Sequence, residues 1–439
     1  MKSLDCLHSP SEETRQVCGH LMNSAKQPYF QYFNGESLSY ALICSACHEA
    51  PEISCADLKS VCTACFQLIE RMNWWQGIVG QPLIGERQTS LHFQHRTIWG
   101  LGVNSNDLVD IQPFEKTNGE WIGLTADNTL LRFQPNEPCT VRVLGTITTP
   151  DAQLFTALKL SPDGKLAVLY QPFGEHGVVV ELESLQQRQY LQRDGYHNYI
   201  TLFSVAFVVH DGRTLLVYSP KWNRLDICDP WTGELLTARD LPDDESEDDF
   251  PEHDLHYFHG QLAVSPDQQW IADDGWVWHP VGVVTTWNLH YWVTANIWES
   301  EDGKTKRELC GRDYFWNGHM CWIDNQTLAI WGYGKDDEWL IPAVLLFDVG
   351  SGKELRWFAG PEVVSHDGKK SSIDRDALIF DRYLFSLSVT KGVQVWDVES
   401  GERLLTDSSF FPKRYHRRTQ EFLTCLTDGS FQLSRLADQ

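Results

Sequence analysis

Apolar runs of strand length alternate with turn-forming residues through most of this chain of 439 residues. Four segments share one arrangement, in which an apolar run meets an Asp turn and a second apolar run follows. They begin at Leu160, Val209, Val264 and Trp322, and the first reads Leu-Ser-Pro-Asp-Gly-Lys-Leu-Ala-Val-Leu. The pattern predicts pairs of antiparallel strands joined by tight turns.

A second turn recurs downstream of these segments and reads Asp-x-x-Ser/Thr-Gly-x-x-Leu. It begins at Asp229, Asp348 and Asp397, each time after an apolar run and before another. This is the place of a hairpin turn, where Gly takes a positive φ and Asp or Ser/Thr bonds nearby backbone. The last two copies stand 49 residues apart (397 − 348). The repeating unit is therefore strand, Asp turn, strand, loop, strand, Gly turn, strand.

Four antiparallel strands repeating at this period resemble a β-propeller blade, and the Ser-Pro-Asp-Gly turns with Trp396-Asp397 resemble the WD40 family. The resemblance is to a divergent member, because a Trp-Asp dipeptide ends just one of the expected strands. It implies a mainly β fold with about seven blades, and a six-bladed ring is the main alternative. The expected blades span residues 95–150, 152–195, 200–240, 255–298, 314–360, 374–410 and 414–437.

The last expected blade is short by one strand. Propellers commonly complete such a blade with a strand from the other end of the domain, and the segment from Ser90 to Leu101 is the candidate. Closure removes the exposed sheet edges that would otherwise pair with other chains.

Aromatic side chains are abundant, with 18 Trp residues. Ligand cages are one reading, but blades pack on one another through large inward side chains, which favours a role in the core. We therefore expect core positions for Trp276, Trp278, Trp287, Trp292, Trp298, Trp316, Trp322 and Trp331.

The first 65 residues contain a different pattern, made of closely spaced cysteines and histidines. Four ligand-type pairs occur there, namely Cys6-x-His8, Cys18-x-His20, Cys44-x-x-Cys47 and Cys62-x-x-Cys65. Zn²⁺ prefers four thiolate or imidazole ligands in a tetrahedron, and a Cys-x-x-Cys turn offers two sulfurs from one loop. Eight ligands predict two structural Zn²⁺ ions.

The pairing of these ligands has several solutions. The two Cys-x-x-Cys pairs have the spacing of a two-knuckle site, which leaves the two Cys-x-His pairs for a second ion. The alternatives are a cross-braced exchange of pairs between the ions, or a single ion on the two Cys-x-x-Cys pairs. His48 and Cys55 lie among the pairs, and either could replace a member.

Residues 1–72 resemble an N-terminal zinc module of bacterial proteins of poorly defined function. Cys6-x-His8, Val17-Cys18-Gly19-His20-Leu21 and Val61-Cys62-Thr63-Ala64-Cys65-Phe66 carry the resemblance. It implies metal binding and no particular reaction. A module of this size buries little apolar surface, so a bound ion would supply folding free energy. We expect a zinc module over 1–75 and a propeller over 76–439, with Trp74-Trp75 as the hinge between them.

The charge balance argues against nucleic-acid binding, because 36 basic and 60 acidic side chains give a net charge of −24. Acidity concentrates in residues 240–254, which predict a solvated loop inserted into the propeller. This loop either serves solubility, pairs with the basic stretch Lys413–Arg418, or steers a basic protein partner. The candidate partner-binding residues are Asp243, Asp244, Glu245, Glu247, Asp248 and Asp249.

No phosphate loop, zinc-protease helix or nucleophile elbow occurs in the sequence. The function expected is a non-catalytic interaction scaffold, or a regulatory or immunity-like protein, with an acidic surface for a protein partner. The alternative is a propeller enzyme, a hydrolase or lyase, with its site at the mouth of the central channel; convergent charged groups with perturbed pKa values there would favour it. The chain shows no signal-peptide-like or membrane-spanning apolar stretch. We expect a cytoplasmic monomer with reduced cysteines.

Overall fold

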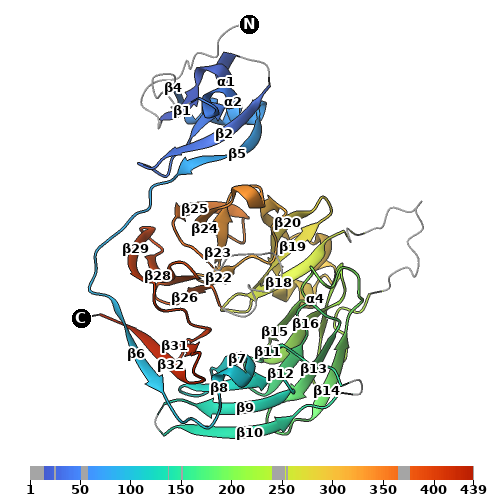
Figure 1. Cartoon of the computed structure of the whole chain (residues 1–439). Coiled ribbons are helices and arrows are strands. Elements are labelled where there is room, and N and C mark those ends of the chain that lie inside the picture. The colour runs from blue at the N-terminus through green and yellow to red at the C-terminus, as the bar shows by residue number, and fades with distance from the viewer. Residues whose placement is uncertain are drawn as a thin grey trace.

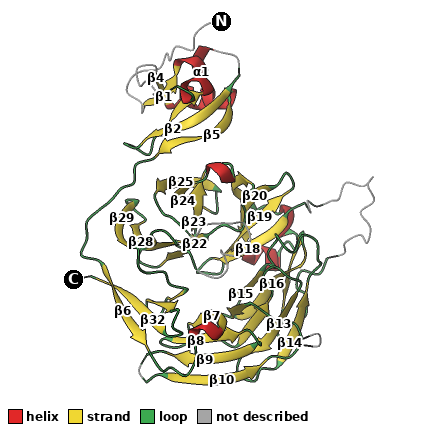
Figure 2. Ribbon diagram, in the orientation of Figure 1, coloured by secondary structure: helices red, strands yellow, loops and turns green. Residues whose placement is uncertain are grey.

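The computed structural model describes residues 14–23, 26–50, 58–136, 138–149, 152–239, 253, 256–363 and 376–438. It consists of a small N-terminal module and a ring of seven antiparallel sheets (Figure 1, Figure 2). The mainly β fold and the seven-bladed propeller predicted from the repeats are confirmed.

The N-terminal module is a five-stranded sheet of order β4-β1-β3-β2-β5 with three short helices. Strands β1 and β3 are parallel, as are β2 and β5, and the other neighbours are antiparallel. Its elements are β1 (Thr14–Cys18), α1 (Gly19–Asn23), β2 (Pro28–Asn34), β3 (Ala41–Cys44), α2 (Ser45–His48), β4 (Leu58–Cys62), α3 (Thr63–Met72) and β5 (Trp74–Gln81). The sheet thus continues past the expected boundary at residue 75, and Trp74 and Trp75 begin its edge strand.

The first three blades contain strands in sequence order from the channel outward. Blade 1 is β7 (Leu108–Phe114), β8 (Glu120–Thr125), β9 (Thr129–Gln134) and β10 (Thr140–Thr146), preceded by the 3-10 turn η2 (Ser105–Asp107). Blade 2 is β11 (Ala157–Leu160), β12 (Leu166–Tyr170), β13 (His176–Glu181) and β14 (Gln187–Gln192). Blade 3 has three strands within the described residues, β15 (Val205–His210), β16 (Arg213–Lys221) and β17 (Arg224–Cys228).

Blades 4 to 6 each have four strands. Blade 4 is β18 (Phe258–Val264), β19 (Trp270–Val277), β20 (Val281–Asn288) and β21 (Arg307–Asp313), with α4 (Leu289–Thr294) and α5 (Glu299–Asp302) between the last two. Blade 5 is β22 (Met320–Trp322), β23 (Thr327–Tyr333), β24 (Ile341–Asp348) and β25 (Lys353–Ala359), with the 3-10 turn η3 (Asp337–Trp339). Blade 6 is β26 (Leu378–Phe380), β27 (Leu384–Ser388), β28 (Gly392–Asp397) and β29 (Glu402–Asp407). The helices carry blade 4 to residue 313, beyond the expected end at 298.

Blade 7 closes the ring with strands from both ends of the propeller. Strands β30 (Arg414–His416), β31 (Glu421–Cys425) and β32 (Phe431–Ala437) are completed by β6 (His92–Ile98). The β6–β32 pairing is antiparallel and runs from Phe431↔Ile98 to Ala437↔His92. Closure by the Ser90–Leu101 segment is therefore confirmed, and β6 belongs to the last blade instead of the first.

The recurring turns have the predicted chemistry. Gly233, Gly352 and Gly401 have φ of 78°, 71° and 74°, and each donates its amide to the carbonyl of the Asp four residues earlier at 2.8 Å. Ser161 Oγ donates to Asp163 at 2.6 Å, and Ser265 makes the same bond in blade 4. Local hydrogen bonding thus explains why these motifs end the strands.

The tryptophans expected in the core are buried or partly buried, with one exception. Trp276, Trp287, Trp292 and Trp322 are buried, and Trp298, Trp316 and Trp331 are partly buried. Trp278 is 49% exposed, which contradicts its predicted place in the core. It lies in the turn after β19, where the strand period no longer determines the direction of the side chain.

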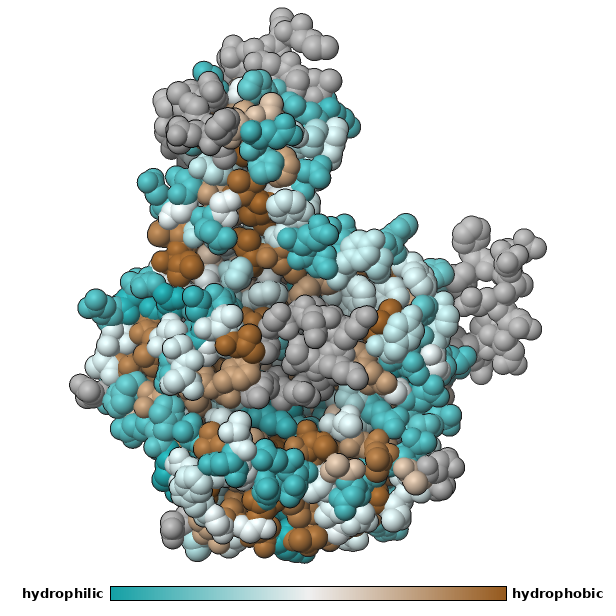
Figure 3. Space-filling view, in the orientation of Figure 1, coloured by the Kyte–Doolittle hydropathy of each residue, from teal (hydrophilic) through white to brown (hydrophobic). Residues whose placement is uncertain are grey.

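The module packs on blade 5 through aromatic side chains of β2 and β5. The Phe33 ring lies 6.2 Å from that of Tyr333 and 5.9 Å from that of Trp357, and Ile78 and Ile341 complete this small core. Figure 3 shows apolar residues gathered where the module meets the ring. The docking surface is therefore formed by these strands, and the linker that follows β5 connects to blade 6, where Arg87 donates its amide to Arg403.

Candidate functional site

Two strand-to-helix turns of the module place the candidate metal ligands. Strand β1 ends at Cys18, and the turn into α1 carries His20; strand β3 ends at Cys44, and the first turn of α2 carries Cys47. Because β1 and β3 are parallel neighbours, with Val17 opposite Leu42, their carboxyl ends meet at one edge of the sheet. The two ligand pairs therefore face each other.

The ligand atoms of Cys18, His20, Cys44 and Cys47 all lie within 4.8 Å of one another. Cys44 Sγ is 3.7 Å from Cys47 Sγ, and Cys47 Sγ is 3.4 Å from His20 Nδ1. A tetrahedral Zn²⁺ ion with Zn–S bonds of about 2.3 Å holds its sulfurs roughly 3.8 Å apart. The cluster thus has the composition and the spacing of a site for one metal ion.

The surroundings raise the pKa of two thiols of this cluster, Cys18 and Cys47. Burial raises the pKa of Cys18, and the neighbouring Cys44 adds to the effect. Burial and the charges of Cys18 and Cys44 raise the pKa of Cys47 to about 12. A cation among the sulfurs would reverse this repulsion, so metal binding would release protons from the site.

The pairing of ligands differs from the expected two-knuckle site. Cys62 and Cys65 stand apart from the cluster, because β4 runs antiparallel to β1 and places Cys62 opposite Thr14. Cys62 therefore lies at the start of β1 and Cys18 at its end, roughly 13 Å away at about 3.3 Å per residue. His48 also stands apart and packs against Phe30. Cys6, His8 and Cys55 lie outside the described residues.

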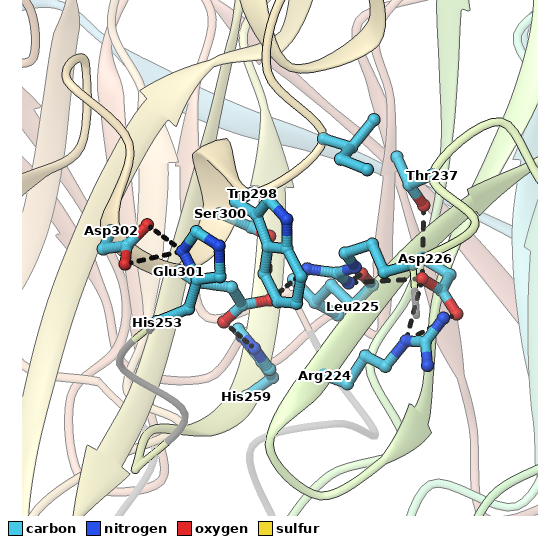
Figure 4. Close-up of polar contacts among 12 residues, drawn as sticks. Arg224, Leu225, Asp226, Thr237, His253, His259, Trp298, Ser300, Glu301 and Asp302 are labelled. Atoms are coloured by element: carbon cyan, nitrogen blue, oxygen red, sulfur yellow. Dashed lines mark hydrogen bonds and ion pairs between the residues drawn. The ribbon is translucent and has the colours of Figure 1, made fainter. Parts of the chain in front are cut away.

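The six candidate carboxylates of the acidic insertion lie outside the described residues as well, but its flanks are part of a buried ionic network (Figure 4). Arg239, before the insertion, pairs with Glu301 at 3.0 Å and with Asp226 at 3.2 Å. After it, His259 Nδ1 lies 2.7 Å from Asp273, and its Nε2 lies 3.5 Å from Glu301. Helix α5, which carries Glu301, therefore holds both ends of the insertion.

Burial opposes the charged forms of His259 and Glu301, but their charged partners outweigh it. Burial alone would lower the pKa of His259, but Asp273 and Glu301 raise it above its usual value. Burial alone would raise the pKa of Glu301, but His259, Arg239 and Lys306 lower it to about 2. The partners thus favour the charged forms of His259 and Glu301, and their ion pairs fix these segments.

The basic stretch Lys413–Arg418 is used within the propeller. Arg414 is buried and pairs with Asp110 of blade 1 at 2.7 Å. Arg417 donates to the Phe380 carbonyl of blade 6, and Arg418 donates to Asn118 of blade 1 at 2.6 Å. These bonds tie blade 7 to its neighbours, so stabilising contacts explain this stretch without the acidic insertion.

The inner strands of the seven blades line a central cavity of about 800 Å³. Charged groups converge there. Desolvation lowers the pKa of Lys159 to about 8, against the opposing charges of Asp110 and Asp376. Desolvation also raises the pKa of Asp376, although Arg414 offsets part of the effect. Arg414 and Asp110 bond each other, whereas Lys159 forms no ion pair within 4.0 Å among the described residues.

Comparisons with models of known protein families and with curated proteins find no match. Among the described residues, no helix is both long enough and apolar enough to cross a bilayer. Sequence reasoning missed the ionic network and Lys159. Neither carries a local signal, since the partners stand far apart along the chain.

Proposed function

We propose that this chain is a non-catalytic interaction protein, in which a zinc-stabilised module and a propeller form one platform for a basic protein partner. The observation that carries the proposal is the docking of the module on blade 5. The Phe33 ring packs on Tyr333 and Trp357, and Gly77 lies against Trp339 so closely that a Cβ there would be 2.8 Å from its ring. The docked module therefore adds its own surface to that of the ring, and the metal site would stabilise the module.

Zinc is the metal proposed, because three thiols and one imidazole suit it well. We propose a second ion on the pairs that the first cluster leaves, which are Cys6, His8, Cys62 and Cys65. This is the exchange of pairs in place of the two-knuckle arrangement. The acidic insertion remains the proposed steering element for the partner, with Asp243, Asp244, Glu245, Glu247, Asp248 and Asp249 as its charges.

The test uses the full chain as bait in extract of its native host, beside a bait with those six residues changed to Ser or Asn and a bait carrying Cys44→Ser. A partner with an excess of Lys and Arg should be retained by the wild type. Its association rate should fall with rising salt, and the neutralised bait should lose this dependence. Identical rates and salt slopes for the wild type and the neutralised bait would remove the insertion from the proposal. Retention of no protein beyond a heat-unfolded control would contradict the interaction role.

One observation favours the alternative of a ligand or catalytic site in the channel. Lys159 and Asp376 both have perturbed pKa values, and Asp376 is 47% exposed to the cavity. Charged groups with perturbed pKa values in a cavity are typical of functional sites. The test is the thermal midpoint with inorganic phosphate, acetate or glycine, for the wild type and Lys159→Met. A rise that disappears in the variant would favour this alternative; no rise in either protein would argue against it.

A further inference from the structure

Four large aromatic side chains are exposed together at the turns of blades 2 to 4. The exposed fractions are 46% for Tyr196, 64% for Tyr199, 49% for Trp278 and 57% for Tyr314. Tyr196 and Tyr199 belong to the connection from β14 to β15, Trp278 to the turn from β19 to β20, and Tyr314 to the turn after β21. We call this group the aromatic surface. Trp and Tyr are enriched at protein interfaces, and exposed clusters of apolar side chains often mark such sites.

Three members of the aromatic surface are connected through the ring of His197. The His197 ring lies 4.4 Å from Tyr196, 5.8 Å from Tyr199 and 5.2 Å from Trp278. Tyr314 lies next to this group along the backbone, because its amide donates to the carbonyl of Pro280, two residues beyond Trp278, at 3.0 Å. The turn of Trp278 and the turn of Tyr314 are therefore neighbours.

A buried stack holds this surface in place. The Trp276 ring stacks on Phe258 at 3.8 Å and on Trp316 at 5.1 Å. Trp276 Nε1 donates to Thr201, and Trp316 Nε1 donates to the Ile200 carbonyl, which anchors the connection that carries Tyr196 and Tyr199. A surface ordered before binding loses little conformational entropy when a partner binds.

The backbone beneath the surface is strained. His197, His279, Tyr314 and Asn317 have φ of 52°, 142°, 58° and 54°, a region that non-glycine residues rarely adopt. Such conformations persist where the surrounding structure enforces them, and they are frequent at binding sites. The stack thus supports the connection that contains His197, because Ile200 and Thr201 both donate their amides to the His197 carbonyl.

Carboxylates border the aromatic surface on the side of blade 5. Asp313 precedes Tyr314, and its backbone forms an isolated parallel β-bridge with that of Asp336. Asp336 begins the turn that contains Asp337 and Glu338. Burial and the like charges of Asp336 and Glu338 raise the pKa of Asp337. No ion pair within 4.0 Å involves these four carboxylates among the described residues, and Lys335 is the one cation in the same turn. The border therefore carries four carboxylates beside one lysine, and its net charge is negative.

The same turn continues into the interface with the module. Trp339, next to Glu338, packs against Gly77 and Phe30. The turn that carries the acidic border therefore also contacts the docked module. Aromatic rings beside carboxylates suit guanidinium and ammonium groups, which stack on the rings while pairing with the carboxylates.

We propose that the aromatic surface and its acidic border bind an Arg- and Lys-rich segment of a partner protein. The inference rests on the proposed interaction role and assigns the partner to this surface, in addition to the acidic insertion. Arginine is the preferred anchor, because its planar group both stacks and forms paired hydrogen bonds.

The experiment measures binding of a synthetic peptide of alternating Arg and Gly to the full chain by calorimetry. The same peptide with citrulline in place of Arg, which is neutral and nearly isosteric, is the ligand control. The aromatic variant is Trp278→Ser with Tyr199→Ser, and the charge variant is Asp337→Asn with Glu338→Gln. Trp99→Ser is the matched control, because Trp99 is 68% exposed and lies outside this surface.

The Arg peptide should bind the wild type, and the citrulline peptide should bind at least about tenfold more weakly. The aromatic variant should weaken binding at least about fivefold, as expected for truncated aromatic anchors. The charge variant should reduce the dependence on salt, and Trp99→Ser should change Kd less than about twofold. Thermal midpoints of all variants establish that the propeller remains folded.

Equal affinity of the aromatic variant and the wild type would overturn the inference, as would a wild type that does not bind the Arg peptide. The proposed function is distinguished by a separate arm. If neutralising the acidic insertion abolishes binding while the aromatic variant binds normally, the interaction role stands and this surface is excluded from it. If binding of the natural partner does not depend on its basic side chains, the charge argument fails for the proposed function and for this inference.

Discussion

His259 is a histidine held between two carboxylates with no exposure of its side chain. Its neighbours raise its pKa above the usual 6.5, so the folded state binds this proton more tightly than the unfolded chain does. By linkage, the stabilisation is fully present below pH 6.5 and is lost as pH rises through the raised value. A single buried residue therefore makes the stability of the propeller dependent on pH.

His259→Gln tests this dependence. The variant should lose about 3 kcal/mol of unfolding free energy at pH 6, because Asp273 and Glu301 lose their shared cation. The loss should shrink as pH rises above the folded-state pKa, since the wild type declines and the variant does not. Urea unfolding across pH 6 to 9 measures it, with His92→Gln as the control. A constant difference between the two proteins at all pH values would contradict the linkage.

Strand β6 is the element on which the ring depends. Phe93 and Ile98 are buried against neighbouring blade cores, and the backbone covers the edge of β32. Without β6, blade 7 would expose that edge to solvent and to other chains.

A chain that begins at residue 105 should therefore be far less stable than one that begins at residue 82, although both keep every recurring turn. We expect the thermal midpoint to fall by at least about 10 °C, because several kcal/mol of packing and hydrogen bonding are lost. Calorimetry measures the difference. Equal midpoints would mean that the ring closes without β6.

Strand β5 is the element that fixes the module. Gly77→Val would place a side chain where the Trp339 ring lies, since even a Cβ would approach it to 2.8 Å. We expect the module to detach while its metal content is unchanged, and the linker between β5 and β6 should become far more sensitive to protease. Gly311→Ala is the control, because its Cβ would meet nothing closer than 3.9 Å. Unchanged proteolysis would argue that the interface adapts.

Elements with a local signal were predictable, and elements that depend on distant partners were not. The Gly turns at Gly352 and Gly401 follow from residues four positions apart, and the missing strand of blade 7 follows from counting. The pairing of Cys18 with Cys44 depends on the parallel alignment of β1 and β3, which no local pattern specifies. Helices α4 and α5 were also missed. Glu301 of α5 is buried through ion pairs with Arg239 and His259, which lie outside that segment.

The whole molecule contains two kinds of core. The module has its own apolar cluster around the candidate metal ligands, and the propeller has several between its blades. A smaller cluster joins them. Two units with separate cores should unfold as separate transitions, coupled only through the shared contacts.

Metal removal should therefore affect one transition. We expect Cys44→Ser, or a strong chelator, to abolish the transition of the module and to shift that of the propeller by no more than a few degrees. Elemental analysis of protein purified without chelator should give close to two Zn²⁺ per chain. A content of one Zn²⁺ per chain would support only the cluster that contains Cys18 and Cys44. A content near zero would contradict the zinc site. Loss of both transitions together would mean that the ring needs the metal.

Ring closure also sets an order of events in time. His95 and Ser434 hydrogen-bond across the closing pair although they stand 339 residues apart. At about 5 to 20 residues per second, β6 leaves the ribosome roughly 20 to 70 s before its partner strand exists. During that interval all strands of the module are already synthesised, whereas the partner strand of β6 in the ring is not. The propeller can therefore close only after β32 has been synthesised. A product that ends before β32 keeps an unpaired strand edge, which cellular quality control can detect.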